Sequence, residues 1–401
     1  MTRVIEGGIT AAHGFTAAGV NCGIKKERND FCLIASDIPA AAAAMFTTNK
    51  VAAAPVVFDK EQLQKSPYIS VIAANSGVAN ACTGEQGMLD CRAWAAKTAE
   101  TLKVKAEQVL VASTGVIGSY LPMDNILRGV ELAAAALSRD GHLEAEKAIM
   151  TTDTKPKEYA VEIESAAGTF RIGGMAKGSG MMKPNMATML TFLSTDANLS
   201  PETLNLALRQ AVEVSFHCIS VDNDTSTNDT VALLANGEAG GEEILPDSPA
   251  FQDFCAGLRT VCVELAKMLV RDGEGTTKLI EIQIKRAANA AEAKIGARAV
   301  ADSYLVKTAI HGGDPNWGRI IAALGYSGIT LTPEQVTLDI NGAPILRQNF
   351  QQAGTRAELR KLLATDTIVI VADLGLAEGE CTFWTSDLSN AYVDINAKYT
   401  T

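Results

Sequence analysis

The segment KGSGMMKPNMATML, residues 177–190, is the part of this chain that best predicts how it folds and works. It passes from a glycine-rich stretch through Pro184 into an apolar run that begins at Met189. Glycine allows close approach of backbone to backbone, and proline restricts one dihedral angle. The segment therefore predicts a constrained loop that leads into a β-strand, with Thr188 at the junction.

Thr188 is interpreted as a nucleophile that is hidden inside a peptide bond. A threonine hydroxyl needs a neighbouring base, which the free α-amine of an N-terminal threonine can supply. That amine has a reference pKa of about 7.7 to 8, whereas the amide nitrogen between Ala187 and Thr188 is not basic. Attack of the Thr188 hydroxyl on the Ala187 carbonyl, followed by hydrolysis of the ester, would release the amine without a protease.

An ordinary flexible loop is the alternative interpretation of residues 177–190, because such connections are rich in glycine and proline. A phosphate-binding loop is excluded, since the segment lacks the G-x-x-x-x-G-K-[ST] spacing that such a loop requires. Motifs elsewhere in the chain favour the nucleophile.

Five further motifs accompany this segment: ANSG at 74–77, ANACTG at 79–84, STGVIG at 113–118, TTDT at 151–154 and HGGDPNWGR at 311–319. Together they resemble the ornithine acetyltransferases, also called glutamate N-acetyltransferases, the ArgJ family of arginine biosynthesis. The resemblance implies an α/β fold, the layered α-β-β-α sandwich shared with self-processing aminopeptidases. It also implies self-cleavage into an alpha chain, 1–187, and a beta chain, 188–401, which stay intertwined and assemble as a heterotetramer of two alpha and two beta chains.

The resemblance assigns an oxyanion hole to the Thr114 side chain and the Gly115 backbone. Both residues follow an expected strand at 109–112 and precede a helix that opens near 121–123. We therefore expect them in a strand-to-helix turn, where backbone N–H groups face a bound anion. From the sequence alone, an ordinary turn with a threonine cap is the alternative.

A pocket for amino-acid substrates should combine hydroxyls, a lysine and a carboxylate, because ornithine and glutamate present carboxylates and amino groups. Lys177 would suit a carboxylate, and Glu274 the distal ammonium of ornithine. Read singly, these two residues are a solvated charge and a turn carboxylate, and the C-terminal residues are a frayed tail. The substrate contacts that the resemblance implies are Thr154, Lys177, Thr188, Glu274, Asn396 and Thr401, with the tail folded over the pocket.

The implied activity is ping-pong transfer of an acetyl group from N2-acetyl-L-ornithine to L-glutamate through an acetyl-threonine ester. It requires no cofactor and no metal, although some members of the family also take acetyl-CoA as the donor. One rival is a self-processing aminopeptidase or amidase, in which water accepts the acyl group. Another is a non-catalytic α/β amino-acid-binding protein whose chain stays intact.

Composition agrees with a cytoplasmic enzyme. The 35 Lys and Arg against 46 Asp and Glu give a net charge of −11 without a basic block, so nucleic acid and anionic membrane are not expected as partners. The N-terminus has no apolar signal core, and no apolar run reaches membrane-spanning length.

Eight scattered cysteines and four histidines do not predict a metal site, and the acidic run 222–229 lacks the glycine and final glutamate of a calcium loop. We expect that run to form a structured turn near the site.

Short apolar runs alternate with helical stripes, which is typical of α/β proteins. Within 279–285, isoleucines alternate with polar residues and predict a sheet with one wet face. Ser200-Pro201 and Ser248-Pro249 predict helix starts, and the second helix should end before Gly273. Strands are expected at 69–74, 109–112, 159–163, 279–285, 336–340 and 367–372, with a surface connection at 236–249.

Overall fold

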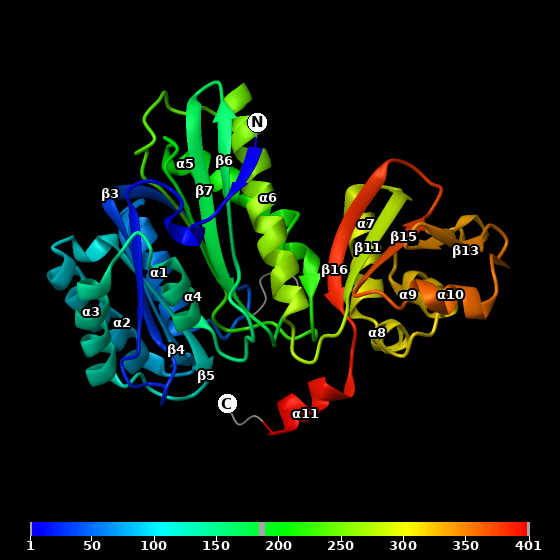
Figure 1. Cartoon of the computed structure of the whole chain (residues 1–401), viewed down its shortest axis with the longest axis horizontal. Coiled ribbons are helices and arrows are strands. Elements are labelled where there is room, and N and C mark those ends of the chain that lie inside the picture. The colour runs from blue at the N-terminus through cyan, green and yellow to red at the C-terminus, as the bar shows by residue number, and fades with distance from the viewer. Residues whose placement is uncertain (1, 184–188, 399–401) are drawn as a thin grey trace.

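The computed structural model describes residues 2–183 and 189–398. Within these residues the chain forms a nine-stranded and a seven-stranded sheet, with helices packed against both (Figure 1). Sheets and helices lie in layers, so the expected layered α/β class is confirmed. No helix of the described residues is long and apolar enough to cross a membrane.

The larger sheet has the order β1-β6-β7-β8-β10-β3-β4-β5, and β2 pairs with β3. Its helices are α1 to α6, with α6 on the side that faces the second sheet (Figure 1). The bounds are β1 (Thr2–Ile5), β2 (Phe15–Val20), β3 (Phe31–Phe46), β4 (Tyr68–Val78), β5 (Val109–Val116), β6 (Glu158–Ser165), β7 (Gly168–Lys177), β8 (Leu190–Thr195) and β10 (Thr230–Ala235), with α1 (Ala54–Lys65), α2 (Gly84–Leu102), α3 (Met123–Ala136), α4 (His142–Ile149), α5 (Pro201–Glu213) and α6 (Pro249–Arg271).

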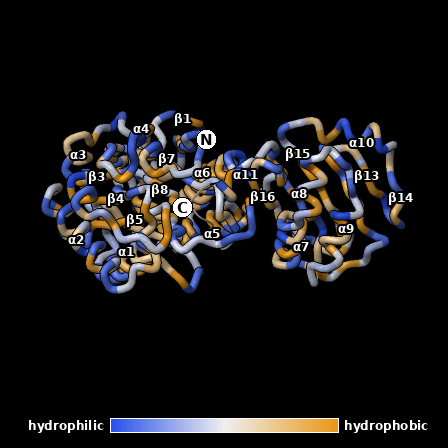
Figure 2. Tube along the Cα trace, turned by 90° about the horizontal axis from the view of Figure 1, so that it is seen from below, coloured by the Kyte–Doolittle hydropathy of each residue, from blue (hydrophilic) through white to orange (hydrophobic). Residues whose placement is uncertain are grey.

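The smaller sheet has the order β14-β13-β12-β15-β11-β16-β9. Figure 2 shows it as a second body beside the larger one, and α11 runs back beneath the junction (Figures 1 and 2). The bounds are β9 (Ile219–Ser220), β11 (Leu279–Ala287), β12 (Thr337–Ile340), β13 (Ala343–Arg347), β14 (Gln351–Gln352), β15 (Thr367–Asp373) and β16 (Gly379–Ser386), with α7 (Ala290–Asp302), α8 (Tyr304–His311), α9 (Trp317–Tyr326), α10 (Arg356–Leu362) and α11 (Asn390–Lys398).

The segment of residues 177–190 joins two neighbouring strands of the larger sheet. β7 ends at Lys177, β8 begins at Leu190, and these two residues are partners in an antiparallel ladder. Every residue of β8 is buried, which confirms the strand that the apolar run predicts. β8 in turn pairs in parallel with β10, so it lies in the middle of the sheet. Cleavage before residue 188 would therefore leave strands of both pieces interleaved in one sheet.

Local sequence signals account for the elements around this centre. All six expected strands are present, and the isoleucines of β11 are buried while Glu281, Gln283 and Lys285 are not. The Ser200 and Ser248 hydroxyls cap α5 and α6 by accepting from backbone N–H groups three residues on, at 3.2 and 3.1 Å. α6 ends at Arg271, as the sequence predicts.

The cap of α6 offers a stability test. Ser248→Ala should lower the free energy of unfolding by about 1 kcal/mol, because the Phe251 N–H loses its acceptor at the start of the helix. Urea denaturation would measure the loss. Ser248→Asp serves as the control, since aspartate caps helices as well as serine does, and equal stabilities of the two variants would contradict this role of the hydroxyl.

Candidate active site

A cavity of about 110 Å³ lies where β7 ends and the connection to β8 begins. It gathers Thr114, Gly115, Lys177, Glu274 and Asn396, five of the residues that the sequence analysis selected, although they lie up to 282 positions apart in the chain. The remaining lining residues are Ala79, Ile117, Thr151, Gly180, Met181, Ser226, Thr227 and Asn228. Ala187, Thr188 and Thr401 lie outside the described residues.

Thr114 and Gly115 belong to β5, so the expected strand-to-helix turn is wrong at this point. The strand continues to Val116 because its parallel neighbour β4 also continues, pairing Ser76 with Thr114 and Gly77 with Gly115. Gly115 has φ of +131°, and a Cβ there would lie 2.3 Å from the Gly77 carbonyl carbon. Only glycine fits this position. Thr114 and Gly115 both line the cavity.

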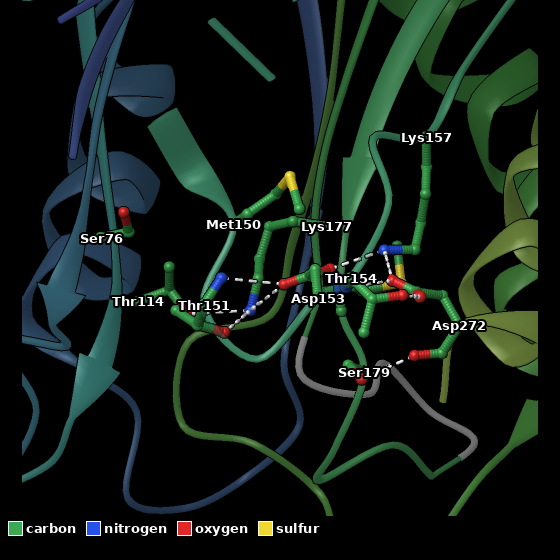
Figure 3. Close-up of polar contacts among 12 residues, drawn as sticks. Ser76, Thr114, Met150, Thr151, Asp153, Thr154, Lys157, Lys177, Ser179 and Asp272 are labelled. Carbon is green, nitrogen blue, oxygen red and sulfur yellow. Dashed lines mark hydrogen bonds and ion pairs between the residues drawn. The ribbon is translucent and has the colours of Figure 1, made fainter. Parts of the chain in front are cut away.

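Lys177 is buried rather than solvated. Its ammonium donates to the Thr151 hydroxyl at 2.8 Å and to the Thr114 hydroxyl at 3.3 Å (Figure 3). Burial lowers the pKa of Lys177, and the nearby Asp153 carboxylate, 3.8 Å away, opposes that shift. Because the ammonium uses the Thr114 oxygen as an acceptor, the Thr114 proton is left to donate elsewhere, and the residue lines the cavity.

Asp153 and Lys157 are buried beside Lys177, and together with the Asp272 carboxylate, whose side chain is 7% exposed, they form a charge cluster that was not predicted from the sequence (Figure 3). Lys157 lies 2.7 Å from Asp153 and 2.6 Å from Asp272. Asp153 also accepts from the Gly178 N–H at 2.7 Å, at the start of the connection between β7 and β8. Burial opposes ionisation of Asp153, but Lys177 and Lys157 hold its pKa below the usual value. The spacing of Asp153 and Lys157 within TTDTKPK was the available signal.

Glu274 and Asn396 meet at the mouth of the cavity. The Asn396 amide donates to a Glu274 carboxylate oxygen at 2.8 Å, which brings α11 back to the site. Gly180 makes room for this carboxylate, since a Cβ there would approach it to 2.6 Å. The alternative interpretation of Asn396 as part of a frayed tail is therefore wrong.

The chain just before α11 is held at Asp387. That carboxylate accepts from His311 at 2.7 Å and from the backbone N–H groups of Thr277 and Lys278 at 2.8 and 2.9 Å. His311 is the first residue of the 311–319 motif, and its contact with Asp387 anchors the segment that carries Asn396.

Thr154 does not line the cavity that contains Lys177. Its hydroxyl and its backbone N–H both bind the Asp272 carboxylate, and it lines a neighbouring cavity of about 640 Å³. Glu274 lines both cavities and so lies where they adjoin. Thr154 is thus placed beside the larger space rather than next to Thr114.

The acidic run 222–229 is a structured turn at the site, as predicted. Ser226, Thr227 and Asn228 line the smaller cavity. The Asn228 amide donates to the carbonyls of Ala79 and Ser113 at 2.6 and 2.8 Å, which ties this turn to β5. The sequence predicts a turn near the site but not these contacts, because they join segments that lie far apart in the chain.

Comparison with known proteins gives consistent matches along the chain. A model described as the ArgJ family matches residues 16–401. The chain is 48% identical over 400 residues to the arginine biosynthesis bifunctional protein ArgJ of Symbiobacterium thermophilum, covering 99% of each, and 44% identical over 399 residues to the protein of that name from Streptococcus mutans, covering 100% of each.

Two solved structures are also similar. The arginine biosynthesis bifunctional protein argJ of Bacillus halodurans is 40% identical, with 47% of this chain and 98% of that chain covered and a TM-score of 0.44. The ornithine acetyltransferase of Mycobacterium tuberculosis, crystallised with ornithine, is 38% identical, with 47% and 100% covered and a TM-score of 0.43.

The buried charge cluster predicts a large loss of stability for Asp153→Asn. Removing one partner leaves Lys157 and Lys177 without full compensation, so unfolding should become easier by about 3 kcal/mol near pH 7. The folded-state pKa of Asp153 is depressed, so its contribution is complete above the ordinary aspartate value of about 3.9 and is lost as the pH falls through the folded-state value. Urea denaturation at several pH values would measure both effects.

Asp394→Asn is the matched control for that variant. Asp394 and Lys398 are also four residues apart and ion-paired at 3.1 Å, but both side chains are exposed. Exposed pairs contribute little, so this variant should unfold like the wild type. Equal losses in the two variants would contradict the importance of burial.

Proposed function

The chain belongs to the ArgJ family, and we propose that it is a self-processing N-acetyltransferase of arginine biosynthesis, which moves an acetyl group from N2-acetyl-L-ornithine to L-glutamate. The observation that carries this proposal is the cavity at the end of β7. It collects a threonine hydroxyl, a glycine backbone, a buried lysine and a carboxylate next to the connection that contains Thr188.

Self-cleavage is the first proposed step. The Thr188 hydroxyl attacks the Ala187 carbonyl carbon, an ester forms as the peptide bond breaks, and the hydroxyl proton passes to the departing nitrogen. Water then hydrolyses the ester, which restores the hydroxyl and leaves a carboxylate on Ala187. The chains 1–187 and 188–401 result, and the new amino group of Thr188 becomes the base for its own hydroxyl.

Acetyl transfer follows by the same nucleophile. Thr188 attacks the acetyl carbonyl of N2-acetyl-L-ornithine, and the Thr114 hydroxyl and Gly115 N–H stabilise the oxyanion. Ornithine takes up a proton and leaves, and the α-amine of glutamate attacks the acetyl-threonine ester. Lys177 would pair with a substrate carboxylate and Glu274 with the distal ammonium of ornithine, while Thr154, Asn396 and Thr401 complete the substrate contacts.

Donor and product are amides of similar α-amines, so the exchange needs neither a cofactor nor a metal ion. Acetyl-CoA is the second donor that we propose, supported by the relatives that are named bifunctional. The interleaved order of β7, β8, β10 and β3 supports two pieces that stay together after cleavage. We further propose a heterotetramer of two alpha and two beta chains in the cytoplasm.

Intact mass and acetyl exchange test the proposal together. Wild-type protein should give fragments 1–187 and 188–401 and should move labelled acetyl from N2-acetyl-L-ornithine to glutamate. Thr188→Ala should stay as one chain and show no exchange, because it lacks the attacking hydroxyl. Processing in both proteins would defeat the assignment, and release of free acetate in place of acetylglutamate would support an amidase. A parallel assay with acetyl-CoA and glutamate tests the second donor.

The oxyanion role of Thr114 predicts a specific kinetic defect. Thr114→Ala should lower kcat of the processed enzyme by about a hundredfold, as expected when one donor to the developing oxyanion is removed. Thr114→Ser keeps the hydroxyl and should retain most of the activity. An unchanged kcat in the alanine variant would exclude Thr114 from the oxyanion hole.

A further inference from the structure

We propose that Asp222 and Asp229 are positioning residues for self-cleavage, which hold the backbone on either side of the bond between Ala187 and Thr188. The inference rests on the proposed function, since it concerns the same bond. Neither residue was selected from the sequence as part of the site, and the two lie at the ends of the acidic turn 222–229.

Asp222 holds the chain before the bond. Its two carboxylate oxygens accept from the N–H groups of Met181 and Met182, at 2.5 and 2.7 Å. The backbone adds to this contact, because the Val221 N–H donates to the Met182 carbonyl at 2.8 Å. The Asp222 N–H also donates to the Met182 carbonyl at 3.4 Å, so four hydrogen bonds fix the entry to the connection.

Asp229 holds the chain after the bond. One of its carboxyl oxygens accepts from the Met189 N–H at 3.0 Å, and the Thr230 N–H donates to the Met189 carbonyl at 3.1 Å. Met189 is the residue next to Thr188, and the two nitrogens of these residues lie within about 4 Å of each other by covalent geometry alone. Asp229 and Thr230 therefore fix the backbone of the residue that directly follows Thr188 in the chain.

The burial of Asp229 is costly, which argues for a role beyond stability. The residue is fully buried, and no hydrogen bond of ordinary geometry reaches its second oxygen, Oδ2, among the described residues, although the nearby Thr47 hydroxyl offsets part of the effect of burial on its pKa. Burial raises its pKa well above the ordinary aspartate value. Buried polar atoms are nearly always paired, and buried groups with strongly shifted pKa values are enriched at functional sites.

A single turn thus binds the backbone near both ends of the cleaved connection and also lines the cavity. The residues between the two aspartates include Ser226 to Asn228, which face the cavity that contains Thr114 and Lys177. An N-to-O acyl shift requires the hydroxyl to approach the preceding carbonyl closely, and such near-attack geometry is lost when the supporting backbone moves by about 1 Å. The hydrogen bonds from Asp222 and Asp229 provide that support.

The test is the rate of self-cleavage during cell-free synthesis of the full chain, followed by gel electrophoresis. Asp229→Ala removes the acceptor of the Met189 amide and should slow cleavage at least tenfold. Asp229→Asn keeps an acceptor oxygen and should cleave within about threefold of the wild type. This rescue separates positioning from a requirement for charge.

Asp59→Ala is the matched control. Asp59 is buried in α1, accepts from a single buried backbone N–H, that of Val111 at 2.9 Å, and also has a pKa raised by burial. It lies outside the site, so its loss should lower the thermal midpoint without changing the cleavage rate. Equal slowing in the Asp59 and Asp229 alanine variants would reduce the role of Asp229 to stability and overturn the inference.

Asp222→Ala keeps the inference falsifiable if Asp229→Ala does not fold. It removes the acceptors of the Met181 and Met182 N–H groups and should also slow cleavage at least tenfold. Cleavage at the wild-type rate would overturn the proposal that both aspartates position the connection. The proposed function would fail differently, by leaving the wild-type chain uncleaved. Rapid cleavage in wild type and in both alanine variants would defeat only the positioning role.

Discussion

The buried pairing of Asp153 with Lys157 and Lys177 is the interaction on which the site depends. Charges removed from water are tolerated only when they are paired and hydrogen-bonded, and each oxygen of Asp153 has such partners. The same carboxylate binds the Gly178 N–H, so it also sets the direction in which the chain leaves β7. Electrostatic compensation and backbone placement are thus performed by one group.

Strand order turns this local arrangement into an active site. β7 and β8 are neighbours in the ladder, so the two ends of the connection between them lie about one strand spacing apart. Lys177, at the end of β7, lines the same cavity as Thr114 and Gly115 of β5. The acidic turn 222–229 leads directly into β10, and α11 brings Asn396 from the end of the chain. Four segments distant in sequence therefore converge on one small cavity.

The elements with strong local signals could be predicted from the sequence, because caps, prolines and alternating isoleucines act within a few residues. α6 begins after Ser248 and ends before Gly273 for this reason. The extension of β5 to Val116 could not be predicted, since it depends on hydrogen bonds to Gly77 in another strand. The burial of Lys177 could not be predicted either, because a lysine is usually exposed unless carboxylates and hydroxyls from other segments surround it.

By itself the sequence determined the α/β class, the strand that follows residue 188, the motifs of the ArgJ family and five of the residues that line the candidate site. Only the tertiary structure decided that five of those residues share one cavity, that Thr154 lies beside another, and that Asp153, Asp222 and Asp229 hold the chain around the site. The reason is physical. Propensity, capping and periodicity are properties of neighbouring residues, whereas burial, charge pairing and cavity shape arise between segments that only folding brings together.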